Sequence, residues 1–185
     1  MAILILLISR GGSLMSAKSN DFEMKMKYLF NNDNQFLIRD ISRREDNRVI
    51  VSLKKRQGIQ STATYIVFYD EGSRISIRTT NFLVNEKNLL LMTLMAQYIN
   101  NEVLPFSCYI KKAKDGQYDM FFITDLIDLS NDENSFSTEV FMDVFNRHKK
   151  YLETIDMIIF KIACGDINAD NIEFKCKTVL EKTMF

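Results

Sequence analysis

Four short apolar runs follow one another between residues 35 and 80, and polar residues separate each run from the next. In "RISIRTT", Arg74–Thr80, isoleucines alternate with polar residues, which is typical of a strand with one buried and one solvated face. Glu71-Gly72-Ser73 precedes it, and glycine there permits the positive φ of a tight hairpin. These features predict an antiparallel sheet. Its strands are expected at Gln35–Ile41, Arg48–Arg56, Thr64–Asp70 and Arg74–Thr80.

The apolar spacing changes to a helical period on either side of these runs. Asn20 or Asp21 is expected to cap a first helix, which stops in Asn31–Asn34. A second helix over residues 85–101 has an apolar stripe, and a third, capped by Ser137, continues its stripe for about seven turns. The two stripes are Leu91, Leu94, Met95, Tyr98 and Ile99, and then Phe141, Val144, Phe145, Leu152, Ile155, Ile159 and Ile162; Phe136 and Phe141 would form a hydrophobic staple.

A second hairpin is predicted between those two helices, in "PFSCYIKK" and "QYDMFFITDLIDL", with its turn at Asp115-Gly116. Pro105 begins its first strand, where a missing N–H does least harm. The expected fold class is therefore α+β, an antiparallel sheet flanked by helices in the order α-β-β-β-(β)-α-β-β-α. We expect a single domain over residues 20–164, with an N-terminal extension (1–19) and a C-terminal extension (165–185).

Composition narrows the classes of partner. The chain has 185 residues with 46% hydrophobic and 26% charged side chains, which suits one folded domain rather than a disordered segment. Lys plus Arg and Asp plus Glu balance at 24 each, so the net charge gives no general attraction to a polyanion. The short basic run Lys54–Arg56 is interpreted as a solvated strand end. No nucleic-acid partner is expected.

Cysteine and histidine usage argues against a metal site. Cys108, Cys164 and Cys176 form no C-x-x-C pair, which fits a reduced cytoplasmic protein. With His148 as the single histidine, zinc ligation of the usual kind is excluded. His148 falls on the apolar stripe of the third helix, so we expect a core histidine bonded to a neighbour rather than a catalytic base. A pocket around it would instead favour an enzyme.

The opening "MAILILLIS" has the apolar character of a signal peptide, but no Lys or Arg precedes it. It is shorter than the ~20 residues that a membrane-spanning helix needs, so no membrane partner is expected. Three interpretations stay open: a cleaved signal, an added strand or helix, and an extended start with Met15 as the true first residue.

The stretch "CGDINADNIEF", Cys164–Phe174, is the most suggestive of chemistry. Asp166, Asn168 and Asp170 match the first three ligand positions of a calcium loop, but the required glycine is Asn171 and the final acidic ligand is Lys177. The stretch also resembles the catalytic loop of aminoglycoside phosphotransferase-like kinases. That interpretation lacks a phosphate loop upstream and a second metal-binding Asp downstream.

A structural explanation of the same stretch needs no missing part. Gly165 follows the last apolar residues of a long helix, where a glycine with positive φ commonly ends the helix. The Asp and Asn residues after it are turn formers that bond nearby backbone N–H groups. The remaining residues, 172–185, are expected to form a short strand or helix.

Other residues give no catalytic constellation. Asp125 and Asp128 lie three apart at a strand end, a spacing that does not define a general acid and base, so we interpret them as surface residues. Methionines such as Met92, Met95 and Met120 are expected in the core, although methionine can also furnish an adaptable contact surface. We therefore predict no catalytic, cofactor-binding or metal-binding residue and no cofactor.

The order of elements resembles the YbjN family within the type III secretion chaperone-like superfamily. The resemblance covers residues 21–162 and includes the passage Y-I-N-N-x-x-x-P-F, Tyr98–Phe106, where that family places a helix ending in Asn before the first strand of the second hairpin. It implies an antiparallel sheet with helices against one face, self-association, and binding of another protein rather than catalysis. The neutral charge departs from the acidity common among secretion chaperones.

The leading hypothesis is therefore a non-enzymatic, homodimeric module of YbjN or secretion-chaperone type that binds another protein and acts in regulation or chaperoning. The alternative is a small-ligand or calcium-binding protein that uses the Asp166–Asp170 loop. An enzyme with a pocket at His148 is the third possibility.

Overall fold

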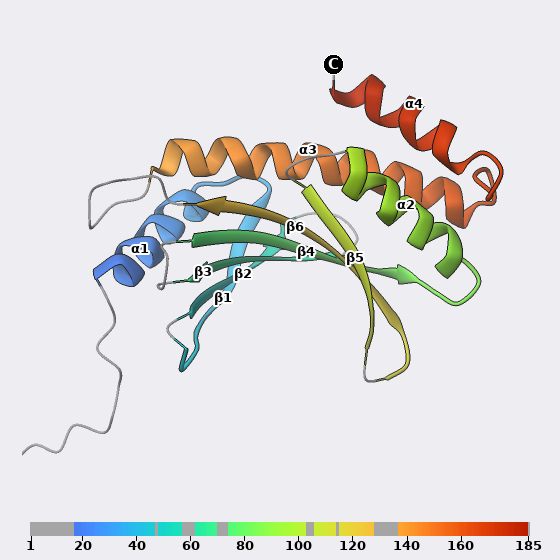
Figure 1. Cartoon of the computed structure of the whole chain (residues 1–185). Coiled ribbons are helices and arrows are strands. Elements are labelled where there is room, and N and C mark those ends of the chain that lie inside the picture. Colours follow the sequence, from blue (N-terminus) through green and yellow to red (C-terminus); the bar gives the residue numbers. More distant parts are fainter. Residues whose placement is uncertain are drawn as a thin grey trace, which may run out of the picture.

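The computed structural model describes residues 17–46, 48–56, 62–69, 74–102, 106–113, 115–127 and 137–184. These residues form a six-stranded antiparallel sheet in the order β1-β2-β3-β4-β6-β5, with its helices on one face (Figure 1). The α+β prediction is confirmed. The elements are α1 (Ala17–Asn31), β1 (Phe36–Arg43), β2 (Arg48–Lys55), β3 (Thr62–Tyr69), β4 (Arg74–Val84), α2 (Leu89–Glu102), β5 (Phe106–Lys112), β6 (Tyr118–Ile127), α3 (Thr138–Ala163) and α4 (Ile172–Met184).

The strands alternate between a helix-covered face and an opposite face, as the sequence pattern predicts. Ile66 on β3 faces Ile77 on β4 across the ladder, and both are fully buried beneath the helices. The alternate residues Tyr65 and Arg78 also face one another, but on the opposite side of the sheet. The optional fourth strand of the expected order is thus present, and it continues through Val84.

The core lies between the sheet and the helices in two clusters. One contains α1, the four strands β1–β4 and the first turns of α3, where Phe30 and Phe36 each pack edge to face on Phe145. The other contains α2, β5, β6, the rest of α3 and α4. α3 therefore spans both clusters (Figure 1). Met92, Met95 and Met120 are fully buried, which confirms that these methionines belong to the core.

Both predicted ends of α3 are confirmed. The hydroxyl of Ser137 accepts a hydrogen bond from the Val140 N–H at 3.2 Å, as an N-cap should. At the other end Gly165 has a φ of +83°, and the Asp166 N–H bonds to the Lys161 carbonyl at 2.9 Å. This pair of features is the Schellman stop that a glycine after the helix permits. Phe136, the other half of the expected staple, lies outside the described residues.

The first helix begins earlier than predicted. α1 starts at Ala17, so Asn20 and Asp21 lie inside the helix and the predicted cap is wrong. Asp21 instead pairs with Lys25 at 2.8 Å, one turn further along, while Ser19 is buried. A capping residue type inside a helix is tolerated where it has such a partner, because its side chain then does not compete for the backbone.

The C-terminal segment forms a helix that packs on the domain. Ile172, Cys176 and Leu180 of α4 are spaced by four residues and are buried against α2 and α3. The expected short strand or helix at residues 172–185 is thus a helix over 172–184. Figure 1 shows α4 lying beside α2 and the C-terminal half of α3.

Candidate functional site

One face of the sheet has no helix on it in the part of the chain that the structure describes. We call it the open face and define it by the residues that alternate with the core positions. Its centre is formed by aromatic and aliphatic side chains that are only partly exposed, with arginines between them. Its members are Ile50 on β2; Tyr65, Val67 and Tyr69 on β3; Ser76, Arg78 and Thr80 on β4; Phe121 and Ile123 on β6; and Tyr109 on β5.

Tyr69 is the centre of a cationic cluster on this face. The guanidinium carbons of Arg48, Arg74 and Arg78 each lie 5.8 Å from the centre of its ring. A cation at this distance from an aromatic face is attracted to it. Three guanidinium groups from β2 and β4, the two strands that flank β3, therefore converge on one ring.

The arginines of this cluster differ in their acidic partners. Arg48 pairs with Asp46, which lowers the pKa of the Asp46 carboxyl, and Arg74 pairs with Asp125. Arg78 donates to the Tyr69 hydroxyl and, at 3.2 Å, to the Ser76 hydroxyl, and it has no carboxylate partner among the described residues. Of the three arginines in this cluster, Arg78 is thus the one without a carboxylate partner in the described part of the chain.

The rest of the open face is apolar and close-packed. Tyr109 and Phe121 stack with their ring centres 5.0 Å apart. Val67, Ser76 and Thr80 are each at most 5% exposed although no described helix covers them. Larger neighbours shield these small side chains, so aromatic and aliphatic groups are packed closely beside the arginines, and these residue types are typical of protein-binding sites.

The two edge strands of the sheet, β5 and β1, are poorly suited to pair with a strand from a partner. On β5, the backbone N–H and carbonyl of Cys108 bond to the side-chain amide of Asn100, at 2.6 and 2.7 Å. Asn100 of α2 therefore occupies the main-chain groups that a new strand would need. On β1, the register shifts between Ile38 and Asp40, and such a bulge interrupts an edge ladder. Binding of a partner by strand addition is therefore disfavoured at both edges.

His148 is a core residue, as the sequence analysis expected. Its ring is 1% exposed, and burial lowers its pKa to about 3. Thr79 Oγ1 lies 3.0 Å from Nε2 and Thr124 Oγ1 lies 2.9 Å from Nδ1, so both nitrogens are bonded. Thr64 Oγ1 continues this chain at 3.0 Å from Thr79 Oγ1. The neutral imidazole thus joins α3 directly to β4 and β6, and through Thr79 to β3.

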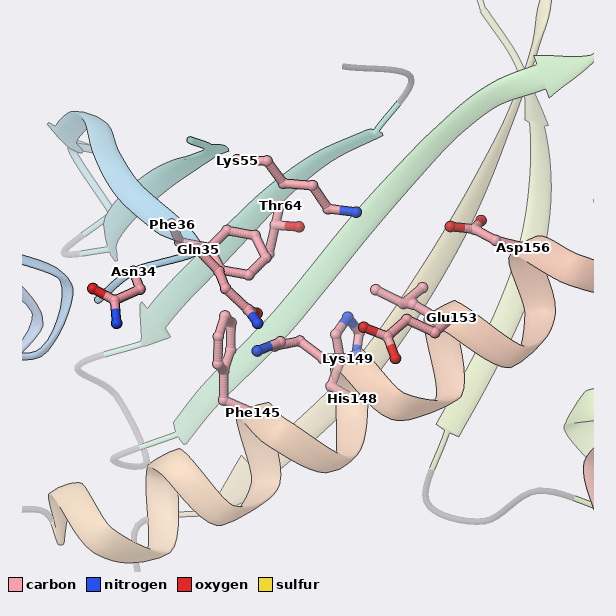
Figure 2. A pocket seen from close by; sticks show the side chains of 11 residues that line it. Asn34, Gln35, Phe36, Lys55, Thr64, Phe145, His148, Lys149, Glu153 and Asp156 are labelled. Carbon is pink, nitrogen blue, oxygen red and sulfur yellow. The ribbon is translucent and has the colours of Figure 1, made fainter. Parts of the chain in front are cut away.

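A cleft does border His148, between α3 and the first three strands (Figure 2). Its volume is about 260 Å³, and Phe36, Thr64 and Lys149 also line it. The histidine nevertheless has no nitrogen left for a substrate, because the two threonines occupy both. The cleft by itself therefore gives no support for a His148-based enzyme.

The Asp166–Asp170 loop is organised around backbone groups rather than around a cation. Oδ1 of Asn168 accepts from the N–H groups of Asp170 and Asn171, at 3.1 and 3.2 Å, and Oδ1 of Asn171 accepts from the Asn168 N–H at 2.9 Å. This reciprocal arrangement is a capping box before α4. Ile167 between them is 1% exposed and belongs to the core. Of the three side chains at calcium-ligand positions, Asn168 therefore already uses its oxygen to hold the backbone.

A similar box precedes α2, where Asn85 and Asn88 exchange backbone-to-side-chain hydrogen bonds at 2.8 and 3.1 Å. The shared pattern Asn-x-x-Asn is the sequence signal that both helix starts carry, and the sequence analysis missed it.

Among the described residues, no group of three or more Asp, Glu, His and Cys side chains could hold a metal ion.

The three cysteines are unpaired. Cys108 and Cys176 are buried, and burial raises the pKa of both thiols, that of Cys176 to about 11, whereas Cys164 is exposed. Asp125 lies at the surface in its ion pair with Arg74, and Asp128 lies outside the described residues. No described helix combines the length and the apolar character that crossing a membrane requires.

No family model matches the chain, and no curated protein matches it in sequence. Among solved structures, the chain is similar to the crystal structure of YbjN from E. coli, described as a candidate transcription regulator. The TM-score is 0.52, the sequence identity is 13%, and the similarity covers 80% of this chain and 92% of that one. The fold is YbjN-like. The resemblance that the element order suggests is confirmed at the level of the fold.

The YbjN-like fold also accounts for the Y-I-N-N-x-x-x-P-F passage. Asn100, the first Asn of that passage, is the residue that bonds the edge of β5, so the motif joins the end of α2 to the second hairpin. The arginines of the open face, in contrast, were not singled out in the sequence. The alternation of residues puts these arginines on the same face of the sheet as Tyr69. Only the strand order brings Arg48, Arg74 and Arg78 close to one another.

Proposed function

We propose that this protein is a non-enzymatic, cytoplasmic regulator that binds another protein on the open face of its sheet. The observation that carries the proposal is the one-sided arrangement of the helices, which leaves an aromatic and arginine-containing face uncovered in the described structure. The solvated face of an antiparallel sheet is usually polar, whereas exposed apolar patches mark interaction sites. The YbjN-like fold, described as that of a candidate regulator, agrees with this role.

The chemistry of the face supports a particular kind of partner segment. Tyr65, Phe121 and Ile123 supply apolar contact area, and Arg78 supplies a guanidinium that has no carboxylate partner among the residues the structure describes. Aromatic residues and arginine are the types enriched at the centres of protein interfaces. The partner segment is therefore one with apolar side chains and a nearby Asp or Glu that reaches Arg78.

Self-association forms the second part of the proposal. Four large apolar side chains of the helical layer are well exposed: Leu90 at 65%, Met157 at 49%, Phe160 at 68% and Phe174 at 69%. A second copy of the chain that packs on the helices would remove these groups from water, while the open face stays available to the other protein. Light scattering should then give a dimer. A monomer across the micromolar range would contradict this part.

Partner capture from an extract of the source cells tests the open face. The double variant Tyr65→Ala/Phe121→Ala should lose the captured protein that the unaltered chain retains. Tyr28→Ala is the matched control, because Tyr28 on α1 is 72% exposed and lies away from the open face. Unchanged melting temperatures would show that the variants fold. Equal capture by the double variant, or no specific capture by the unaltered chain, would overturn the proposal.

A further inference from the structure

The cleft beside His148 has the construction of a ligand site. Its floor is apolar and buried, with Phe36 at 5% and Phe145 at 1% exposure, and Leu152 completes it. The hydroxyl-bearing Thr64 lies in the same wall and is 7% exposed. A volume of about 260 Å³ is slightly below the range for drug-sized ligands, so it suits a molecule of amino-acid size and not a nucleotide or lipid.

Charged side chains of both signs stand around this floor. Lys55 approaches from the end of β2 and Lys149 from α3, while Glu153 and Asp156 lie further along α3. Figure 2 shows the Lys149 ammonium directed toward the Phe36 and Phe145 end, away from the end at which Asp156 lies. The rim thus presents the Lys149 ammonium near one end and the Asp156 carboxylate at the other, with the Lys55 ammonium and Glu153 between them.

Lys149 and Glu153 do not pair with one another, and this distinguishes them from similar residues. Four other oppositely charged pairs at the same i,i+4 spacing do form ion pairs in this protein, including Lys177 and Glu181, which have the same order along the helix. The Lys149 ammonium lies instead 5.6 Å from the centre of the Phe36 ring. Neither Lys149, Glu153 nor Lys55 has an ion-pair partner among the described residues.

We propose that this cleft binds a free α-amino acid with a large apolar side chain. The carboxylate of the ligand contacts Lys149 and Lys55, its ammonium contacts Glu153, and its side chain lies against Phe36 and Phe145. A dipolar ligand matches opposite charges that are held apart, whereas a simple anion would leave Glu153 beside a second negative charge. Thr64 and His148 then form a rigid wall, since their hydrogen bonds are already made.

Calorimetric titration of the full chain with four related probes tests the proposal. L-phenylalanine should bind saturably, and L-leucine should compete with it. 3-Phenylpropionate lacks the ammonium and 2-phenylethylamine lacks the carboxylate, so each should bind at least about tenfold more weakly than L-phenylalanine. Binding of either analogue as tightly as L-phenylalanine, or no binding of either amino acid, would overturn the assignment.

Two pairs of variants locate the site. Lys149→Ala and Lys55→Ala should each weaken L-phenylalanine binding by about tenfold, while the neighbouring Lys150→Ala and Lys54→Ala should leave it unchanged, because those lysines do not line the cleft. Glu153→Gln should weaken L-phenylalanine but not 3-phenylpropionate. Equal effects of the paired lysine variants, or an equal loss of both probes in Glu153→Gln, would contradict the proposed orientation.

Discussion

The Nδ1 atom of His148 lies 2.9 Å from the Oγ1 atom of Thr124, so one hydrogen bond joins the middle of α3 to β6. The other ring nitrogen makes a second bond, to Thr79 on β4. A neutral imidazole can satisfy both hydroxyls because it has one donor and one acceptor nitrogen. The single histidine of the chain therefore acts as a structural link between the longest helix and the centre of the sheet.

Stability should depend on pH through this residue. Burial lowers the His148 pKa from 6.5 to about 3, so between these values the unfolded chain binds a proton that the folded chain does not. Falling pH therefore favours unfolding across that window, by up to about 1.4 kcal/mol per pH unit. Above pH 6.5 the ring is neutral in both the folded and the unfolded chain, so the free energy of unfolding no longer changes with pH through His148.

The variant His148→Gln isolates this effect, because glutamine keeps a donor and an acceptor but does not titrate. At neutral pH it should be less stable by roughly 1 to 3 kcal/mol, since at least one threonine hydroxyl loses its partner. The difference from the unaltered chain, measured by urea unfolding, should shrink as the pH falls from 6 toward 4, within the window that the histidine pKa defines. Parallel stability curves would contradict the assignment of a neutral buried ring.

Gly165 should be replaceable at a cost that depends on the backbone alone. Its φ is +83°, and a Cβ built there meets no atom within 4 Å, so no side-chain clash contributes. Gly165→Ala should lower the free energy of unfolding by roughly 1 kcal/mol, and Gly165→Asn by less, because asparagine adopts this conformation more readily. Chemical denaturation measures both. Equal stability of all three proteins would show that the Schellman stop is dispensable.

Thiol labelling should distinguish the three cysteines. Cys164 is exposed, whereas Cys108 and Cys176 are buried with raised pKa values. An aromatic disulfide reagent at pH 8 should therefore modify one thiol rapidly in the folded protein and all three in denaturant. The variant Cys164→Ser should abolish the rapid phase. Rapid labelling of Cys176 would show that α4 does not stay packed on α2 and α3.

The loop before α4 should stabilise the fold without calcium. Asn168→Ala removes the capping oxygen and should cost roughly 1 kcal/mol, while Asp170→Ala should change little, because the Asp170 carboxylate is exposed and takes no part in the box. Millimolar calcium should leave the melting temperature unchanged, since a ligand that binds the folded state raises it. A rise that Asp166→Asn and Asp170→Asn abolish would restore the calcium-binding alternative.

Much of the fold follows from local signals in the sequence. The alternation of apolar and polar residues predicts the strands, because Ile75 and Ile77 lie on the buried side of the sheet while Arg74 and Arg78 lie on the opposite side. Ser137 and Gly165 mark the two ends of α3 through hydrogen-bonding capacity and positive φ, which are properties of single residues. The first helix is the exception, because the ion pair of Asp21 with Lys25 supports a residue that otherwise prefers a cap.

The candidate sites depend on contacts that no local signal contains. Thr79 and Thr124 reach His148 from two strands that pair although they are far apart in sequence. The same strand order gathers the arginines around Tyr69. The cleft requires α3 to cross the ends of β1–β3, which only the tertiary packing determines. Sequence spacing identified the histidine as buried but could not provide its partners.

The pairing of β4 with β6 has a consequence for folding kinetics. Strands β1–β4 form consecutive hairpins and β5–β6 form another, so each of these ladders closes a short loop. The β4–β6 ladder must instead close the longer loop that contains α2 and β5, at a greater entropic cost. We therefore expect closure of this ladder to limit the refolding rate, with the β1–β4 and β5–β6 hairpins formed before it.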